Sequence, residues 1–288
     1  MTDLHERVLA WYDVHARELP WREASATPWG VLVSEFMLQQ TPVARVLPIY
    51  EQWLSRWPTP ADLAAATSGD AVRAWGRLGY PRRALRLHQV ASAIVSEHGG
   101  QVPTSPSDLR ALPGIGDYTA AAIASFAFGQ RHVVLDTNVR RVIARSVTGV
   151  EFPANTVTRA ERELGTTLLP DNPSTAAAWA VAVMELGALV CVAAAPRCAA
   201  CPIDELCSWR RLGYPAYDGP LRRGQTYAGT DRQCRGKLLH VLRNEPGPVH
   251  RSKLDLVWSD EPQRKRCLAS LLADGLTTAL PGDMYALP

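Results

Sequence analysis

Short amphipathic segments, separated by proline or glycine, make up the first half of the chain. Between residues 5 and 17 the apolar side chains Leu9, Trp11 and Val14 alternate with charged ones, as on a surface helix. Comparable patterns predict helices over 29–40, 42–57, 60–66, 69–77, 82–98, 106–111, 117–128 and 136–147. Because short helices bury their apolar faces against other helices, these segments predict an all-α bundle or barrel.

The second half of the chain contains three different kinds of segment. Residues 150–190 predict two or three further helices, and the stretch 213–230, rich in proline, glycine and arginine, predicts a linker. Residues 231–288 then predict a separate unit with helices over 231–244, 251–257 and 263–274 and a closing β-hairpin. This order of elements is typical of a small winged-helix-like α+β unit.

Composition narrows the classes of function. No run of about 18 apolar residues predicts a membrane span, and the charged N-terminal segment lacks the apolar core of a signal peptide, so we expect a cytoplasmic protein. The net charge of +3 identifies no partner. Lysine is absent before Lys237, which excludes a Schiff-base mechanism on a lysine amine in the first 236 residues.

Arginine is concentrated in the middle of the chain. Residues 70–145 hold ten arginines and five acidic residues, which predicts a surface that faces phosphates. The alternative is that the chain uses arginine heavily throughout.

Four of the six cysteines lie within one segment of seventeen residues. Their spacing is C-x6-C-x2-C-x5-C, at Cys191, Cys198, Cys201 and Cys207. Because disulfides are not expected in a cytoplasmic chain, the spacing favours a metal site. A single C-x2-C between longer loops suits a [4Fe-4S] cluster, with zinc or unliganded thiols as alternatives. Cys234 and Cys267 fall on predicted helices and are expected to be buried apolar residues.

Several motifs, in order along residues 1–212, resemble one family. They are LPWR (19–22), SEFMLQQTPVARVLPIY (34–50), LGY (78–80), LPGIGDYTAAAIASFAFG (112–129), LDTNVRRVIAR (135–145) and MELGALVC (184–191), followed by the cysteine segment. The chain resembles the endonuclease III superfamily of helix-hairpin-helix DNA glycosylases, and within it the MutY-type adenine DNA glycosylases. MLQQT and MELGALVC are the most specific of these motifs, and residues beyond the linker are not covered.

The resemblance implies a fold and a cofactor. It implies a six-helix barrel with the helix-hairpin-helix at 25–137, a [4Fe-4S] cluster domain made of 1–24 and 138–212, and a DNA-binding cleft between them. The hairpin is LPGIG, that is Leu112, Pro113, Gly114, Ile115 and Gly116. Its glycines allow backbone N–H groups to approach a phosphate, and the following helix start favours an anion. Arg197, between two of the cysteines, is a second expected phosphate contact.

Two carboxylates are candidates for catalysis. Glu35 lies in the apolar helix VLVSEFML, where burial should raise its pKa and keep part of it protonated, as a general acid requires. Asp136 follows the apolar run HVVL at a helix start, whose donors should keep it ionised. Without the family, Glu35 could equally belong to a buried ion pair and Asp136 could be an ordinary N-cap.

The resemblance assigns roles to these and other residues. It implies that Glu35 protonates a flipped adenine and that Asp136 stabilises or captures the resulting oxocarbenium ion, so that water completes hydrolysis. Tyr118 and Asn138 match polar helpers near the sugar, and Arg22 and Glu185 match contacts to the adenine. Leu38, Gln39, Gln40 and Thr41 lie in the motif whose side chains, Leu38 and Gln40 above all, wedge into the duplex. For Leu38 and Met37, core packing is the alternative.

The chain also departs from the family pattern. Pro81 stands where a second tyrosine usually follows LGY, Thr137 replaces a glycine after Asp136, and the short unit 231–288 replaces the large domain that reads 8-oxoguanine. We therefore expect adenine removal from both 8-oxoG:A and G:A pairs in double-stranded DNA, with a weaker preference for 8-oxoguanine than full-length relatives show.

The expected enzyme is a monofunctional glycosylase, a cytoplasmic monomer associated with the nucleoid through DNA. It would leave an abasic site, because Tyr118 stands where a lyase has its lysine. The alternatives are a G:T mismatch thymine glycosylase of the same superfamily, an endonuclease III-type lyase, and a non-catalytic metal-containing DNA-binding regulator.

Overall fold

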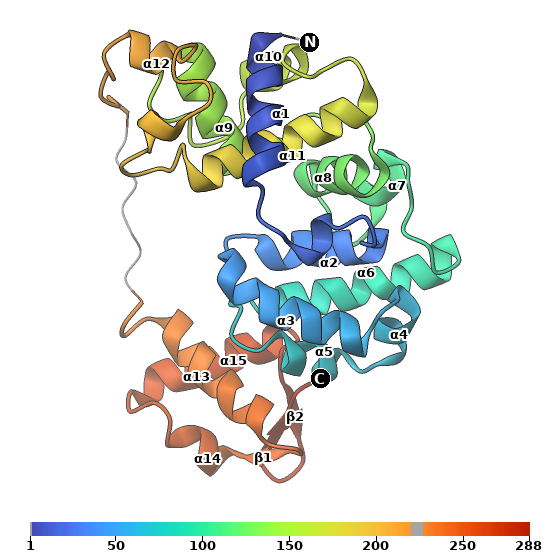
Figure 1. Ribbon diagram of the computed structural model, residues 1–288. Coiled ribbons are helices and arrows are strands. Elements are labelled where there is room, and N and C mark those ends of the chain that lie inside the picture. Colours follow the sequence, from blue (N-terminus) through green and yellow to red (C-terminus); the bar gives the residue numbers. More distant parts are fainter. Residues whose placement is uncertain (1, 220–226) are drawn as a thin grey trace. The chain divides into compact units, whose positions relative to one another are not determined.

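The computed structural model describes residues 2–219 and 227–288 (Figure 1). The chain divides into two compact units, each built from separate stretches of sequence. The first unit comprises residues 1–32, 104–111 and 115–221, and the second comprises residues 33–103, 112–114 and 222–288. The predicted domain boundaries at 24/25, 137/138, 212/213 and 230/231 stay a prediction.

The first unit is all helical. Its helices are α1 (Asp3–His15), the start of α2 (Pro28–Leu38), α7 (Pro106–Ala111), α8 (Asp117–Phe128), α9 (Thr137–Ile143), α10 (Arg159–Thr167), α11 (Pro173–Leu189) and α12 (Ser208–Arg211). Short 3-10 turns lie at Pro20–Arg22 and Cys198–Ala200, and a π-helical turn at Ala144–Thr148 continues α9. Helix α9 therefore ends close to the predicted position, but with a change in its hydrogen-bond pattern.

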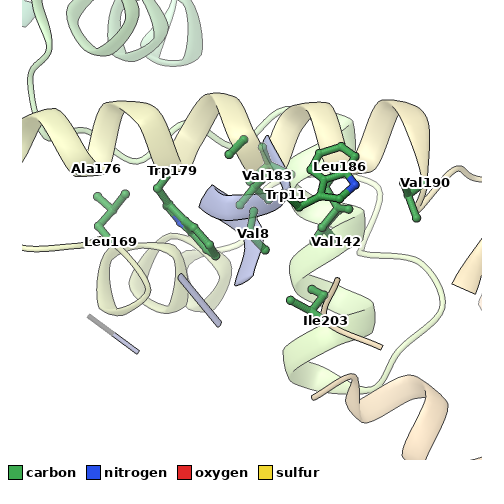
Figure 2. Close-up of a cluster of buried hydrophobic side chains, with 12 residues drawn as sticks. Val8, Trp11, Val142, Leu169, Ala176, Trp179, Val183, Leu186, Val190 and Ile203 are labelled. Atoms are coloured by element: carbon green, nitrogen blue, oxygen red, sulfur yellow. The ribbon is translucent and has the colours of Figure 1, made fainter. Parts of the chain in front are cut away.

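Helix α11 forms the centre of this unit because it is apolar on nearly all sides. Figure 2 shows Trp179, Val183 and Leu186 of α11 beside Val8 of α1 and Val142 of α9. The rings of Trp179 and His5 meet edge to face with centroids 4.6 Å apart. The core thereby fixes α9, whose first residues follow Asp136.

The second unit contains two groups of elements. The first group is the end of α2, α3 (Val43–Arg56), α4 (Pro60–Ala65), α5 (Ser68–Trp75) and α6 (Arg82–His98). The second group is α13 (Asp231–Asn244), β1 (Val249–His250), α14 (Arg251–Asp255), α15 (Glu261–Ala273), β2 (Thr278–Leu280) and β3 (Met284–Ala286).

The three short strands form one antiparallel sheet in the order β1-β3-β2. Tyr285 of β3 lies opposite Val249 on one side and Ala279 on the other. The three helices and the closing hairpin confirm the predicted winged-helix-like unit, and β1 adds a strand that the sequence pattern did not indicate. Cys234 and Cys267 are buried in this unit, as predicted.

Part of the predicted linker is packed against the first unit. The ring of Trp209 meets Tyr214 edge to face, its Nε1 donates to the Pro215 carbonyl at 2.9 Å, and the Tyr217 amide donates to Glu151 at 2.9 Å. Residues 220–226 of the linker lie outside the described residues. Among the residues that the structure describes, no helix is long and apolar enough to cross a membrane.

Candidate functional site

Asp136 is the N-cap of α9. Its Oδ1 accepts a hydrogen bond from the Val139 amide at 2.6 Å, and its Oδ2 accepts one from Asn138 Nδ2 at 2.8 Å. Burial raises the pKa of Asp136, and the hydrogen bonds from Val139 and Asn138 oppose that shift only in part. The predicted helix-start donors are present, but the pKa of Asp136 still lies above its ordinary value because burial has the larger effect.

A chain of hydrogen bonds connects Asp136 to the cysteine segment. Asn138, which donates to Asp136, accepts through Oδ1 from Arg141 Nη2 at 2.8 Å. Arg141 in turn donates to the carbonyls of Gly187 and Cys191, both at 2.7 Å. Buried Arg141 therefore fixes both the orientation of Asn138 and the backbone at the first cysteine.

Helices α9 and α11 approach closely at this point. A Cβ added to Gly187 would lie 2.7 Å from the Asn138 Cβ and 2.9 Å from the Asn138 carbonyl oxygen. Only glycine therefore fits at 187 without moving Asn138. The glycine of the motif MELGALVC has a steric role beside the candidate carboxylate.

Glu185 is fully buried and forms ion pairs with two arginines. Arg17 donates to it through Nε at 2.6 Å and through Nη2 at 2.7 Å, and Arg22 Nη1 lies 2.9 Å from Oε2. Burial alone would raise the pKa of Glu185, but the hydrogen bond from Arg17 and the charges of both arginines outweigh it and lower the pKa. The predicted Arg22 and Glu185 thus meet, and Arg17 joins them.

Tyr118 lies in the first turn of α8, directly after the hairpin. It is half-buried and packs on a small apolar cluster that includes Val134 and Ala180. Within the hairpin, Leu112 and Ile115 are buried, Pro113 is half-buried, and Gly114 and Gly116 are exposed. The left-handed Gly114, with a φ of 76°, faces Arg86, whose Cδ would lie 2.9 Å from an added Cβ.

Helix α2 carries Glu35 and ends at the turn of the MLQQT motif. Glu35 is 8% exposed, which confirms its predicted burial, and belongs to the second unit. Met37 is core, Leu38 and Gln39 are half-buried, and Gln40 is exposed with a φ of 55°. Thr41 is buried and donates to the Leu78 carbonyl at 3.3 Å.

The four cysteines of the predicted cluster line one pocket, together with Arg145. Arg145 Nη1 donates to Cys191 Sγ at 3.5 Å and to the Val192 carbonyl at 2.8 Å. Burial raises the pKa of the Cys201 thiol to about 12, and the charges of the other three cysteines act in the same direction. In the described ranges, no three His, Cys, Asp or Glu side chains are grouped as for a single metal ion.

The predicted phosphate-facing arginine surface is wrong for several of its members. Arg83, Arg140, Arg141 and Arg145 are all less than 10% exposed. Their guanidinium groups donate to backbone carbonyls, and Arg140 also pairs with Glu161 at 2.8 Å. Arg197, in contrast, is exposed.

Comparison with known proteins agrees with the motifs. Residues 33–164 match the model of the HhH-GPD superfamily of base excision DNA repair proteins. An adenine DNA glycosylase of Mycobacterium tuberculosis is 54% identical over 98% of this chain and 92% of its own length. One of Mycolicibacterium smegmatis is 51% identical over 97% and 94%. The solved structure of a thermostable thymine-DNA glycosylase has a TM-score of 0.66 and 27% identity, covering 73% of this chain and 95% of its own.

Proposed function

Because the chain belongs to the MutY-type adenine DNA glycosylases of the HhH-GPD superfamily, we propose that it hydrolyses the N-glycosidic bond of adenine mispaired with 8-oxoguanine or guanine in double-stranded DNA. The observation that carries the proposal is the environment of Asp136. A half-buried carboxylate, held by the Val139 amide and by Asn138 at a helix start, suits stabilisation of a positive sugar.

The proposed roles of the two carboxylates follow from their surroundings. Asp136 receives two hydrogen bonds, which oppose the effect of burial and support its ionised form. In that form it stabilises the oxocarbenium ion or captures it covalently before water completes the reaction. Glu35, buried among the apolar side chains of α2, is the proposed acid that protonates the adenine ring and makes it a better leaving group.

The ion pair of Glu185 with Arg17 and Arg22 is proposed to shape the adenine pocket. A buried carboxylate between two guanidinium groups keeps its place and its charge, and Arg22 retains N–H groups that can contact the base. Tyr118 and Asn138 are proposed to lie beside the sugar. Gly114, Gly116, Arg197, Gln39 and Gln40 are the proposed contacts to the DNA backbone and the vacated base position.

The reaction is proposed to stop at base removal. A lyase would need an amine to form a Schiff base with the abasic sugar, and Tyr118 at the start of α8 offers a phenol instead. Borohydride reduction in the presence of substrate should give no covalent adduct. An adduct would identify the chain as bifunctional.

We also infer that Cys191, Cys198, Cys201 and Cys207 hold a [4Fe-4S] cluster. Two observations indicate that these residues suit such a cluster. Four thiols from one segment line a single pocket, and Arg145 donates a hydrogen bond to Cys191 Sγ. When bound, the cluster joins four points of the segment 191–207. The chain's own contribution is to orient that segment, which carries Arg197, through the carbonyls held by Arg141 and Arg145.

Base release from a panel of duplexes tests the proposed function. The panel carries adenine or thymine opposite guanine or 8-oxoguanine, and rates are measured in single turnover. We expect adenine release from both 8-oxoG:A and G:A pairs, with a preference below several hundredfold. A larger preference would contradict the weak selectivity that we infer from Pro81 and Thr137.

The second candidate, a thymine glycosylase, shares its fold with the solved thymine-DNA glycosylase, but the adenine DNA glycosylase relatives at 54% identity do not favour it. The MLQQT motif and the paired Glu185 favour adenine instead. Thymine release from the G:T duplex without adenine release would establish the second candidate.

A further inference from the structure

The loop Gly76–Pro81, between α5 and α6, has an unusual backbone. Gly76, Gly79 and Tyr80 have φ values of 54°, 86° and 47°. Tyr80 is a bulky residue in the left-handed region, which costs about 1–2 kcal/mol, and such a conformation persists only where its surroundings fix it. The Tyr80 side chain is nevertheless 44% exposed. Contacts to other parts of the second unit must therefore hold this loop.

Some of these contacts come from the winged-helix-like unit, residues 231–288. Arg243, near the end of α13, donates to the carbonyls of Gly76 and, at 2.9 Å, of Val72. Arg232, at the start of α13, places its guanidinium carbon 4.9 Å from the centroid of the Tyr80 ring. One helix of the winged-helix-like unit thus contacts both ends of the loop.

Helices α5 and α13 each donate hydrogen bonds to the C-terminal end of the other. Arg73 of α5 donates to the carbonyls of Arg243 and, at 2.8 Å, of Glu245, while Arg243 donates to the end of α5. Each arginine therefore satisfies the unpaired carbonyls at the C-terminal end of the other's helix, where the helix dipole also favours a cation. Arg82 pairs with Asp274 at 3.4 Å, and the Pro288 backbone fills the space beside Gly69. The unit is docked at several points.

The helix α15 is the one that would enter a DNA groove in a winged-helix reader. Its cations are already paired: Arg264 with Asp255 at 2.8 Å, Lys265 with Glu261 at 2.6 Å, and Arg266 with Asp231 at 2.9 Å. A helix whose cations are matched by nearby carboxylates has little net positive charge to attract DNA phosphates. The charges therefore favour a bracing role over groove reading for residues 231–288.

Arg83 connects the loop to the turn after α2. It is buried, its guanidinium carbon lies 5.2 Å from the centroid of the Tyr80 ring, and it donates to the Gly79 carbonyl at 3.3 Å. It also donates to the Phe36 carbonyl at 2.9 Å and the Gln39 carbonyl at 2.6 Å. The loop and the proposed DNA-contacting turn 38–41 are therefore held by one guanidinium group.

We propose that residues 231–288 brace the loop Gly76–Pro81, and that Arg232 is a positioning residue that holds the exposed Tyr80 ring for stacking on a DNA base. An exposed aromatic ring flanked by guanidinium groups is a common platform for bases. The inference rests on the proposed function, because it requires that the second unit binds DNA.

The test measures binding of the full chain to a duplex with 8-oxoguanine opposite a stable abasic-site analogue, by fluorescence anisotropy. Arg232→Gln should weaken binding about fivefold to tenfold, because a cation–π contact of this kind contributes on the order of 1 kcal/mol. Arg232→Lys should restore most of the affinity. Lys265→Gln, which removes a cation of the same unit far along the chain from the loop contacts, should change it less than about twofold, since its exposed ion pair contributes little.

Two further readouts separate positioning from a direct phosphate contact. If Arg232 acts through Tyr80, the double variant Arg232→Gln/Tyr80→Ala binds no more weakly than Tyr80→Ala alone, and the salt dependence of binding is unchanged in Arg232→Gln. Additive losses, or a salt slope smaller by about one, would overturn the proposal in favour of a phosphate contact.

The proposed function and the brace fail in different ways. If the wild-type chain releases adenine but Arg232→Gln binds as tightly as wild type, the brace is wrong and the function stands. If the wild-type chain releases no adenine from any duplex of the panel, the proposed function is wrong and the brace has no DNA to position.

Discussion

At the scale of single residues, burial and hydrogen bonding have opposite effects on the pKa of Asp136. Burial raises it, and the donors Val139 and Asn138 lower it, with burial the larger effect. Because the proposed role needs the ionised form, the reaction should slow as the pH falls through this raised pKa. The acid limb of the rate profile is therefore expected above the ordinary aspartate value of about 3.9.

Asn138→Ala tests this balance. Removing the Asn138 donor raises the pKa of Asp136 further, so the acid limb should move up by about 1 pH unit, since a hydrogen bond to a charged group contributes roughly 1.5–3 kcal/mol. The measurement is the single-turnover rate across pH. Thr137→Ala, an exposed neighbour in the same turn, is the control and should leave the limb in place. An unmoved or lowered limb for Asn138→Ala would show that Asp136 does not titrate in this step.

Glu185→Gln removes the shared carboxylate of a buried ion-pair group. It leaves Arg17 and Arg22 without a counter-charge, so we expect a loss of about 3 kcal/mol in the free energy of unfolding at neutral pH. The lowered pKa of Glu185 stabilises the fold above the unfolded value of about 4.3, and this contribution is lost as the pH falls through the folded pKa. The difference between variant and wild type should therefore shrink in acid.

Urea unfolding at several pH values provides the measurement. Glu205→Gln, which breaks an exposed pair with Arg7, is the matched control and should cost less than about 0.5 kcal/mol. Equal effects of the two substitutions would mean that the buried group contributes no more than a surface pair.

At the scale of elements, the contact of α9 with α11 positions the candidate carboxylate. Gly187→Ala would push its Cβ into Asn138, so α9 must shift or α11 must move away. We expect overpacking to lower the free energy of unfolding by about 1–3 kcal/mol. We also expect the rate of adenine release to fall, because Asn138 holds Asp136. Gly247→Ala, at a glycine with no atom within 4 Å of an added Cβ, should leave both quantities near wild type. A stable, fully active Gly187→Ala variant would contradict the steric role.

The elements of this fold are easier to predict from the sequence than the contacts between them. Helices such as α6 and α8 could be predicted because apolar periodicity and flanking glycines are local signals, and Gly99 and Gly129 do end them in the left-handed conformation. The partners of Arg83, Arg141 and Arg145 could not be predicted in the same way. Their acceptors are backbone carbonyls up to about fifty residues away, and a carbonyl has no sequence signature.

In the candidate site, too, local features could be predicted from the sequence and tertiary contacts could not. The N-cap at Asp136 was predictable from the residue type before a helix, and the burial of Glu35 from its apolar neighbours. Arg17 was missed because AREL is an ordinary charged stretch whose arginine becomes informative only when the fold brings it to Glu185. The upward pKa shift of Asp136 also depends on burial, which is a tertiary property.

At the scale of the whole molecule, the cysteine segment is connected to the active-site candidate rather than separate from it. Arg141 reaches both Asn138 and the Cys191 carbonyl. Cys198→Ser should abolish bound iron and sulfide and the visible absorbance of the purified full chain, since a thiolate ligand is lost. Cys267→Ala, at a buried thiol of the winged-helix-like unit, should retain them. Zinc in place of iron in the wild-type chain would contradict the proposed cofactor.

The central claim is that this chain removes adenine by a monofunctional mechanism that depends on Asp136. Its most direct test is a single-turnover time course on an 8-oxoG:A duplex, in which free adenine and strand breaks are both quantified before any alkali treatment. We predict stoichiometric adenine release by the wild-type chain, intact strands, and a rate at least about a hundredfold lower for Asp136→Asn, a loss of roughly 2.7 kcal/mol in transition-state stabilisation. Strand breaks that appear together with adenine, or an Asp136→Asn variant as fast as wild type, would contradict it.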